Sequence, residues 1–163
     1  MKILGLDLAI STGWAIAENG SITDSGVVNF KLTAKQTKVI KEEKIREAYG
    51  TRSLKFKNFL NEKHAEIGGF DVICFERVMG RQPSLKADWS YIGFAITLLV
   101  WCEERDIPCI GVAVNTNKDY ATGNGNATKE MMIEAAKEMW FDPENDDEAD
   151  AIHILNYTMK EIL

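Results

Sequence analysis

Two apolar segments of this chain each carry a carboxylate near the end of what is expected to be a buried strand. Residues 2–8 form an apolar run that Asp7 interrupts, and residues 70–76 form a second run that ends with Glu76. Strands this apolar are expected in the centre of a sheet that helices cover on both faces. Carboxylates are almost never fully buried unless they are paired or bind a metal. The two acids therefore predict a polar site where two central strands end.

The hydrophobic pattern predicts three strands joined by tight turns, with Asn19-Gly20 as a hairpin signal, and then two strands that alternate with helices. The predicted strands are 2–8, about 12–18, about 22–30, 70–76 and 109–114. The predicted helices are 34–65, about 86–105, about 128–140 and 147–162, with Gly50 as a break or kink in the first and residues 115–127 as a loop. This order predicts an α/β fold with a mixed five-stranded sheet, three strands antiparallel and two parallel, and helices on both faces. The 163 residues are expected to form one domain, 1–163.

Composition restricts the class of protein only broadly. Hydrophobic residues make up 45% of the chain and charged residues 27%, which is typical of a globular protein. We expect no signal peptide, and the longest strongly apolar stretch, 92–101, is too short to span a bilayer. The three cysteines have no CxxC spacing and predict buried thiols in a reducing compartment.

The net charge of −6 is distributed unevenly along the chain. Residues 31–67 carry ten Lys and Arg against five Asp and Glu, whereas residues 141–150 carry six acids and no base. If four of the acids bind cations and their charges are left out of the count, the net charge of the rest of the chain is −2. The overall charge therefore neither excludes a nucleic-acid ligand nor supports one.

Two more carboxylates are predicted to join the site from the last helix. Asp147 and Asp150 are three residues apart, so a helix places them on one face. An acidic first turn that is simply solvated is the alternative, and we prefer it for the other acids of 142–148. Asp150 differs because Ala149, Ala151 and Ile152 surround it with apolar sequence. Since no His or Cys cluster accompanies these acids, the ions that we expect them to bind are hard cations such as Mg²⁺ or Mn²⁺.

Three segments resemble the RuvC-type Holliday junction resolvases. Gly5-Leu6-Asp7-Leu8-Ala9-Ile10-Ser11-Thr12-Gly13-Trp14 is similar to the first strand and turn of the family, although Leu8-Ala9 stands where the family usually has Pro-Gly. Ile73-Cys74-Phe75-Glu76-Arg77-Val78 resembles the strand-ending glutamate, and Asp147-Glu148-Ala149-Asp150-Ala151 resembles the final acidic pair. The resemblance covers nearly the whole chain in segment order.

The resemblance implies an RNase H-like fold and a structure-selective endodeoxyribonuclease that resolves four-way junctions and other branched DNA. It also implies a location in the cytoplasm of a bacterium or of a phage-infected host. It implies a homodimer that makes paired nicks with water as nucleophile, and two Mg²⁺ ions per site, with Mn²⁺ able to substitute. The implied metal ligands and catalytic residues are Asp7, Glu76, Asp147 and Asp150, below called the four carboxylates. Lys129 is expected as a further catalytic residue that offsets charge on the phosphate.

DNA contacts are expected around the loop that follows Glu76 and around the two lysines that flank residues 119–128. In the family the loop approaches the junction centre, and the lysines lie on the phosphate side. The expected DNA-binding residues are Arg77, Met79, Arg81, Lys118 and Lys129. Met79 is as well explained by packing under its own loop. For Lys129 the alternative is a lysine that is simply solvated in the first helical turn, but a lysine there opposes the helix dipole, and we prefer the functional role.

Other functions remain open from the sequence. A nuclease of the same fold that acts on flaps, forks or RNA-containing duplexes would have the same site. An actin-like ATP-binding lobe shares the Asp and Thr-Gly turn, but it requires a second lobe for which 163 residues leave no room. A junction-binding protein without catalysis is expected to have lost a carboxylate, and none is missing.

Overall fold

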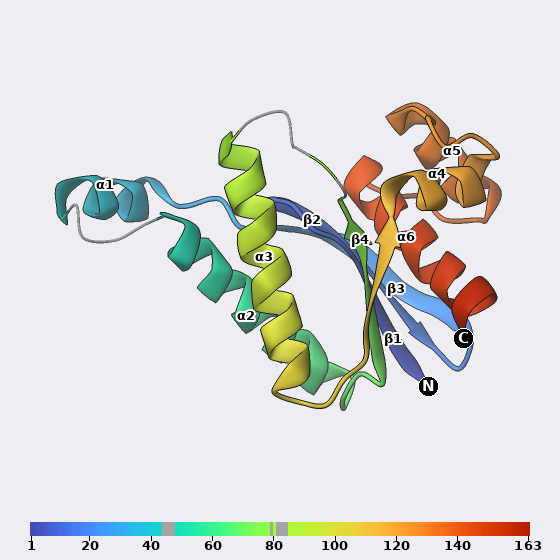
Figure 1. Ribbon diagram of the computed structural model, residues 1–163, viewed down its shortest axis with the longest axis horizontal. Helices are drawn as coiled ribbons and strands as arrows, with labels where there is room; N and C mark the ends of the chain where they lie inside the picture. The colour runs from blue at the N-terminus through green and yellow to red at the C-terminus, as the bar shows by residue number, and fades with distance from the viewer. Residues whose placement is uncertain (44–47, 79, 81–84) are drawn as a thin grey trace.

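The computed structural model covers residues 1–163 and describes 1–43, 48–78, 80 and 85–163 (Figure 1). The strands are β1 Lys2–Asp7, β2 Ser11–Glu18, β3 Ser21–Asn29, β4 Val72–Arg77 and β5 Cys109–Ala113. The helices are α1 Ala34–Glu43, α2 Ala48–Glu66, α3 Leu85–Glu103, α4 Val114–Thr122, α5 Lys129–Glu138 and α6 Asp146–Tyr157, which a π-helical turn, Thr158–Ile162, extends. Within the described ranges, none of the helices combines the length and hydrophobicity that a bilayer crossing requires.

The strands form one mixed sheet in the order β3-β2-β1-β4-β5. β2 pairs antiparallel with both β1 and β3, whereas β4 pairs parallel with β1 and β5. Asn19 and Gly20 join β2 to β3 and have φ values of 53° and 81°. A two-residue hairpin turn requires positive φ values of this kind. The predicted mixed five-stranded sheet is confirmed.

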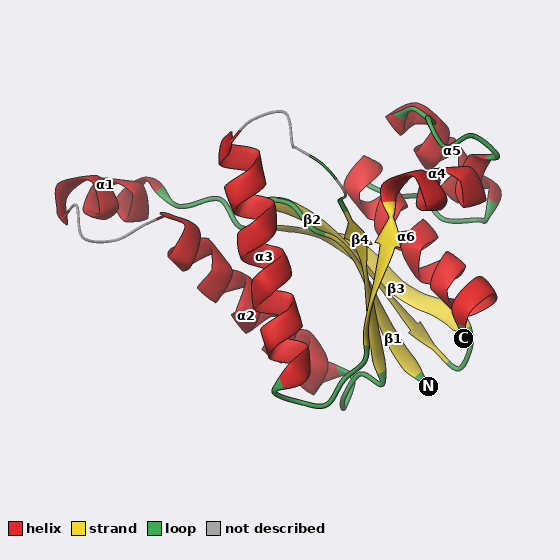
Figure 2. Cartoon of the chain, viewed as in Figure 1, coloured by secondary structure: helices red, strands yellow, loops and turns green. Residues whose placement is uncertain are grey.

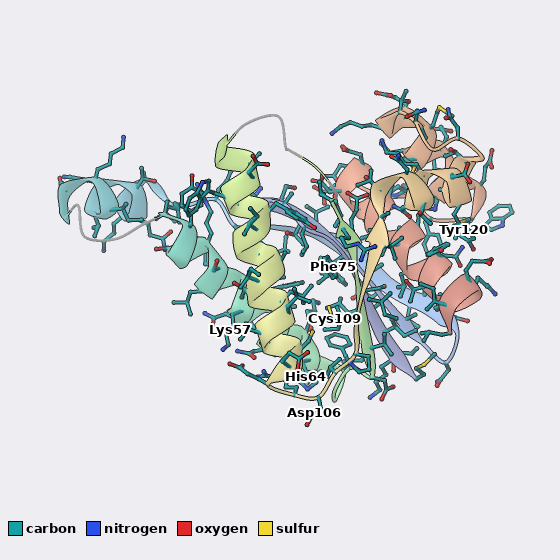
Figure 3. All side chains as sticks on the ribbon, in the orientation of Figure 1. Lys57, His64, Phe75, Asp106, Cys109 and Tyr120 are labelled. Atoms are coloured by element: carbon teal, nitrogen blue, oxygen red, sulfur yellow. The ribbon has the colours of Figure 1, made fainter. Side chains whose placement is uncertain are left out.

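Helices cover both faces of this sheet (Figure 2). On one face α2 and α3 pack over Leu4, Leu6 and Leu8, and Figure 3 shows Phe75 of β4 in the same layer. On the other face α6 packs against Ile3, while α4 and α5 flank α6. Because side chains alternate along a strand, the odd-numbered residues of β1 face α6. Asp7 is therefore on the α6 side of the sheet.

Two predicted details of the helices are wrong. Residues 115–127 are not a loop throughout, because α4 begins directly after β5 and ends at Gly123, whose φ of 70° suits a left-handed helix cap. The Asn- and Thr-rich composition of α4 favours a loop, but its Asn117 is fully buried and its packing against α6 stabilises the helix. Gly50 does not break a helix, since it lies inside α2, and the predicted helix 34–65 is instead described as two helices, α1 and α2.

Candidate metal centre

The carboxyl ends of β1 and β4 lie side by side and bring Asp7 and Glu76 together. The parallel register pairs Leu6 with Phe75, so the two acids are the next residues along neighbouring strands. Cys74 belongs to the core on the α6 side, and Glu76, two residues later, faces the same way. Both predicted strand-end carboxylates thus point toward the first turns of α6.

Close packing of α6 on the sheet brings in the other two acids. A Cβ atom added at Gly13 would overlap with the backbone carbonyl of Asp147, and one added at Gly5 would lie 2.8 Å from Leu155 Cβ. The two glycines therefore let the helix backbone lie directly on β1 and β2. Asp147 and Asp150 both lie in the first turns of this helix, and their three-residue spacing puts them on one face of it.

The four carboxylates lie close enough to act on one another electrostatically. Burial raises the pKa of Asp7 well above its usual value, and the charges of Glu76, Asp150 and Asp147 raise this pKa further. Burial, followed by the charge of Glu76, raises the pKa of Asp150 to about 7. The pKa of Asp147 is also raised by burial, and a hydrogen bond with Ser11 opposes that effect. A cluster of acids that repel one another in this way is stabilised by a bound cation.

Two residues of α4 counter this repulsion, and one of them was not predicted. Burial raises the pKa of Glu76, while the charge of Lys118 and a hydrogen bond with Asn117 lower it. Lys118 also lowers the pKa of Asp150, and its Nζ donates to the Ala127 carbonyl at 3.0 Å. Asn117 Nδ2 donates to the Asp150 carbonyl at 3.4 Å. Asn117 stands three residues after the predicted strand 109–114, and this closeness to the end of an apolar strand, which Asp7 and Glu76 share, was the available sequence signal.

Lys129 lies at the rim of the site. Its side chain is 73% exposed and its Nζ forms an ion pair with Asp146, which raises the pKa of Lys129. The charges of Asp147 and Asp150 raise this pKa as well, so the ammonium lies within electrostatic reach of the carboxylates.

The loop after β4 is only partly described. Arg77 is exposed at the end of the strand, whereas the predicted DNA contacts Met79 and Arg81 lie outside the described residues. The Tyr91 hydroxyl from α3 accepts a hydrogen bond from Val78 N at 2.9 Å and donates to the Glu76 carbonyl at 3.1 Å. Tyr91 thereby holds the backbone that carries Glu76.

Two neighbours of the site on α6 have structural contacts. Glu148 is buried, and it accepts hydrogen bonds from the Ser25 hydroxyl at 2.6 Å and from Glu144 N at 2.8 Å. It is therefore not the solvated acid that the sequence predicted, although it does point away from the four carboxylates. His153 is also buried, with Nε2 3.0 Å from the Met132 carbonyl, and it joins α6 to α5.

The donor chemistry of the site fits a hard cation. Asp150 Oδ1 and Asn117 Oδ1 are both buried and neither has a hydrogen-bond partner, which is unusual for an interior oxygen. Carboxylate and amide oxygens are the ligands that Mg²⁺ and Mn²⁺ prefer. Among the described residues, no three His, Cys, Asp or Glu side chains are already spaced to hold one ion. The carboxylates would have to turn toward a cation when it binds.

Comparisons with known proteins bear on the fold. No protein-family profile matches the sequence, and no curated protein matches it. The structure is similar to Thermus thermophilus RuvC in complex with a Holliday junction substrate, with a TM-score of 0.70 and 16% identity over 98% of this chain and 93% of that one. A second T. thermophilus RuvC structure gives a TM-score of 0.67 and 20% identity over 98% and 94% of the two chains.

The yeast mitochondrial Holliday junction resolvase Ydc2 is similar as well, with a TM-score of 0.66 and 17% identity over 96% of this chain and 77% of that one. The three structures match nearly the whole chain, including the mixed sheet and the helices on both faces. The resemblance seen in the sequence is therefore confirmed at the level of the fold: this chain has the RNase H-like fold of the RuvC-type Holliday junction resolvases.

Proposed function

We propose that this protein is a metal-dependent, structure-selective endodeoxyribonuclease that resolves four-way DNA junctions. The observation that carries the proposal is the convergence of the four carboxylates from β1, β4 and α6 in a RuvC-type fold. Three similar structures are resolvases, and one was solved with a Holliday junction. A fold alone does not determine an activity, so the site has to be tested directly.

The four carboxylates are the groups that would hold Mg²⁺, with Mn²⁺ as a substitute. Asp7 has the central role, because the other three carboxylates all act on its pKa. Bound cations would supply the activation of water and the stabilisation of the departing oxygen. The unpartnered oxygens of Asp150 and Asn117 give the site further acceptors for a cation or for its bound water.

The lysines have different proposed roles. Lys118 lies within electrostatic reach of Glu76 and Asp150, and it keeps both acids easier to ionise at neutral pH. Lys129 is exposed and paired with Asp146, so it is placed to approach a phosphate that enters from solvent. Its positive charge would stabilise the negative charge that develops on the phosphate during cleavage.

A homodimer is the proposed assembly, and α3 offers a surface for it. Trp89, Ile92, Ile96 and Val100 form an apolar stripe along this helix, and each is more than half exposed. Contiguous exposed apolar surface of this kind is rare on monomers and marks interaction sites. We expect Ile96→Glu to shift the protein to a monomer in light scattering and to uncouple the two nicks on a junction. A variant that remains dimeric would place the interface elsewhere.

A cleavage assay tests the proposed activity. Purified protein is incubated with labelled four-way junction, flap, fork, RNA-containing duplex and linear DNA duplex, each with Mg²⁺, Mn²⁺ or EDTA. We expect metal-dependent cutting of the junction in preference to linear DNA, with 5′-phosphate ends. Preferential cutting of flaps, forks or RNA-containing duplexes would assign the site to a related nuclease of the same fold.

The variant Asp7→Asn tests the site itself. It keeps the side-chain volume and removes a metal-binding charge, so cleavage should be abolished while junction binding persists. Asp24→Asn is the matched control, because Asp24 is exposed on β3 and lies outside the site. Near wild-type cutting by Asp7→Asn would refute the proposed metal centre.

A further inference from the structure

The α1 helix projects from the molecule with little packing to hold it there (Figure 1). None of residues 34–42 is fully buried, and α1 makes no extensive contact with another helix or strand of the described ranges. A capping box stabilises its start: Gln36 N donates to Thr33 Oγ1 at 3.1 Å, and Thr33 N donates to Gln36 Oε1 at 3.0 Å. Local interactions thus maintain a helix that contributes little to the core.

This helix presents a positively charged surface. Lys31, Lys35, Lys38 and Lys41 are all exposed, and Lys55 of α2 lies beside them, with its Nζ donating to the Lys31 carbonyl at 3.0 Å. Lys35, Lys38 and Lys41 are the lysines of α1, and their three-residue spacing places them within a sector of roughly 120°, over a rise of about 9 Å.

One ion pair on α1 does little to neutralise this surface. Lys38 lies 3.7 Å from Glu42, with both side chains largely exposed, and such pairs contribute little free energy in water. The lysines therefore remain able to bind another anion.

The charge of the molecule is polarised between its two ends. The acidic segment 141–150 leads into α6, next to α5, and lies at the opposite end of the longest axis from α1 (Figure 1). When no cation is bound, a polyanion near the four carboxylates is repelled at the α5–α6 end and attracted at the α1 end. The field therefore favours a ligand that extends from the site toward α1.

We propose that α1 is a phosphate-binding arm that holds the DNA duplex outside the branch point. This inference rests on the proposed function in one respect, namely that branched DNA is the substrate. The lysines would contact backbone phosphates without reading bases, so they would add affinity and position but no sequence preference. The charge on α1 would compensate for the acidic surface near the site.

The test compares two double variants that have the same net charge. Lys35→Gln/Lys41→Gln removes two lysines of α1, whereas Lys137→Gln/Lys160→Gln removes two exposed lysines at the other end of the chain. Each change takes the net charge from −6 to −8. Gln has nearly the helix propensity of Lys, and circular dichroism checks that the helix content is unchanged.

Binding to a four-way junction is measured by fluorescence anisotropy in EDTA, over a salt series from about 50 to about 300 mM. Loss of two phosphate contacts should make the salt slope shallower by about two and reduce affinity at low salt by roughly tenfold. Hydroxyl-radical footprinting should show that protection of the duplex arm is lost while protection at the branch point remains. The control pair should bind as the wild type does.

Equal loss of affinity in both double variants would overturn the proposal, because net charge alone would then explain the effect. An unchanged salt slope in the α1 variant would overturn it as well. Since these measurements are made without metal, they are independent of cleavage. If the wild-type protein binds a junction through α1 but never cuts it, the proposed function is refuted, whereas the proposed role of α1 in DNA binding is retained.

Discussion

The variant Asp150→Asn is expected to stabilise the protein when no metal is present. The pKa of Asp150 is raised from 3.8 to about 7, mainly by burial and then by the charge of Glu76. The folded state therefore binds a proton more tightly than the unfolded chain does. Ionisation of Asp150 destabilises the fold progressively as pH rises from about 4 to about 7, and the full cost applies above that range.

The size of this effect follows from the shift. A difference of about 3 pKa units corresponds to about 4 kcal/mol at most, and partial solvent access to the carboxyl reduces this to about 2–4 kcal/mol. Asn removes the charge and keeps the shape. At pH 8 in EDTA the variant should thus gain about 2–4 kcal/mol, or roughly 5–15 °C in Tm for a chain of this length. At pH 5 the gain should fall below about 2 kcal/mol.

Urea denaturation at both pH values, with and without Mg²⁺, measures these differences. Mg²⁺ should stabilise the wild type more than the variant, because the cation binds the folded site and the variant lacks one ligand charge. Asp24→Asn, on the exposed surface of β3, should show neither effect. If Asp150→Asn lowers stability at pH 8 in EDTA, the ionised carboxylate of Asp150 stabilises the fold, and its pKa is not raised by burial.

Three further substitutions test the surroundings of the site. Gly13→Ala should destabilise the protein by at least about 3 kcal/mol in urea denaturation, since the new Cβ would overlap with the α6 backbone; a wild-type midpoint would contradict this packing. Glu148→Gln should leave cleavage intact and cost about 1–2 kcal/mol of stability through its two buried hydrogen bonds, and loss of cutting in a fully folded variant would instead place Glu148 in the site. Lys118→Gln should raise the pKa of Glu76, so the acidic limb of the pH–rate profile should move to higher pH; an unshifted limb would show that Lys118 does not act on the carboxylates.

Much of the fold was predictable because it depends on local patterns. The apolar run of residues 2–8, the Asn19-Gly20 turn and the apolar run before Glu76 each define a strand or a hairpin without knowledge of its neighbours. Because side chains alternate along a strand, Asp7 and Glu76 share a face once the two strands are parallel. The structure confirms the five strands and their order along the chain, and the similarity to resolvase structures confirms the fold.

The helices were predicted less well because composition and packing favour different outcomes there. The segment that forms α4 has many Asn and Thr residues, which favour loops, but contact with α6 makes it helical. Gly50 was predicted to break or kink a helix, yet a single helical glycine costs only about 1 kcal/mol, and burial of Phe56, Phe59 and Leu60 farther along α2 outweighs it.

The sequence by itself determined which segments form the five strands, which acids interrupt apolar runs and where the basic surplus that includes α1 lies. Only the tertiary structure decided that Asn117 joins the carboxylates, that Glu148 is buried against β3, and that α1 extends from the body. The physical reason is the separation along the chain over which each effect acts. Alternation and helical spacing are set by bonds between neighbours along the chain, whereas a residue's partners in the site are set by which distant surfaces pack together, and by the few positions, such as Gly13, where the chain leaves room for them to do so.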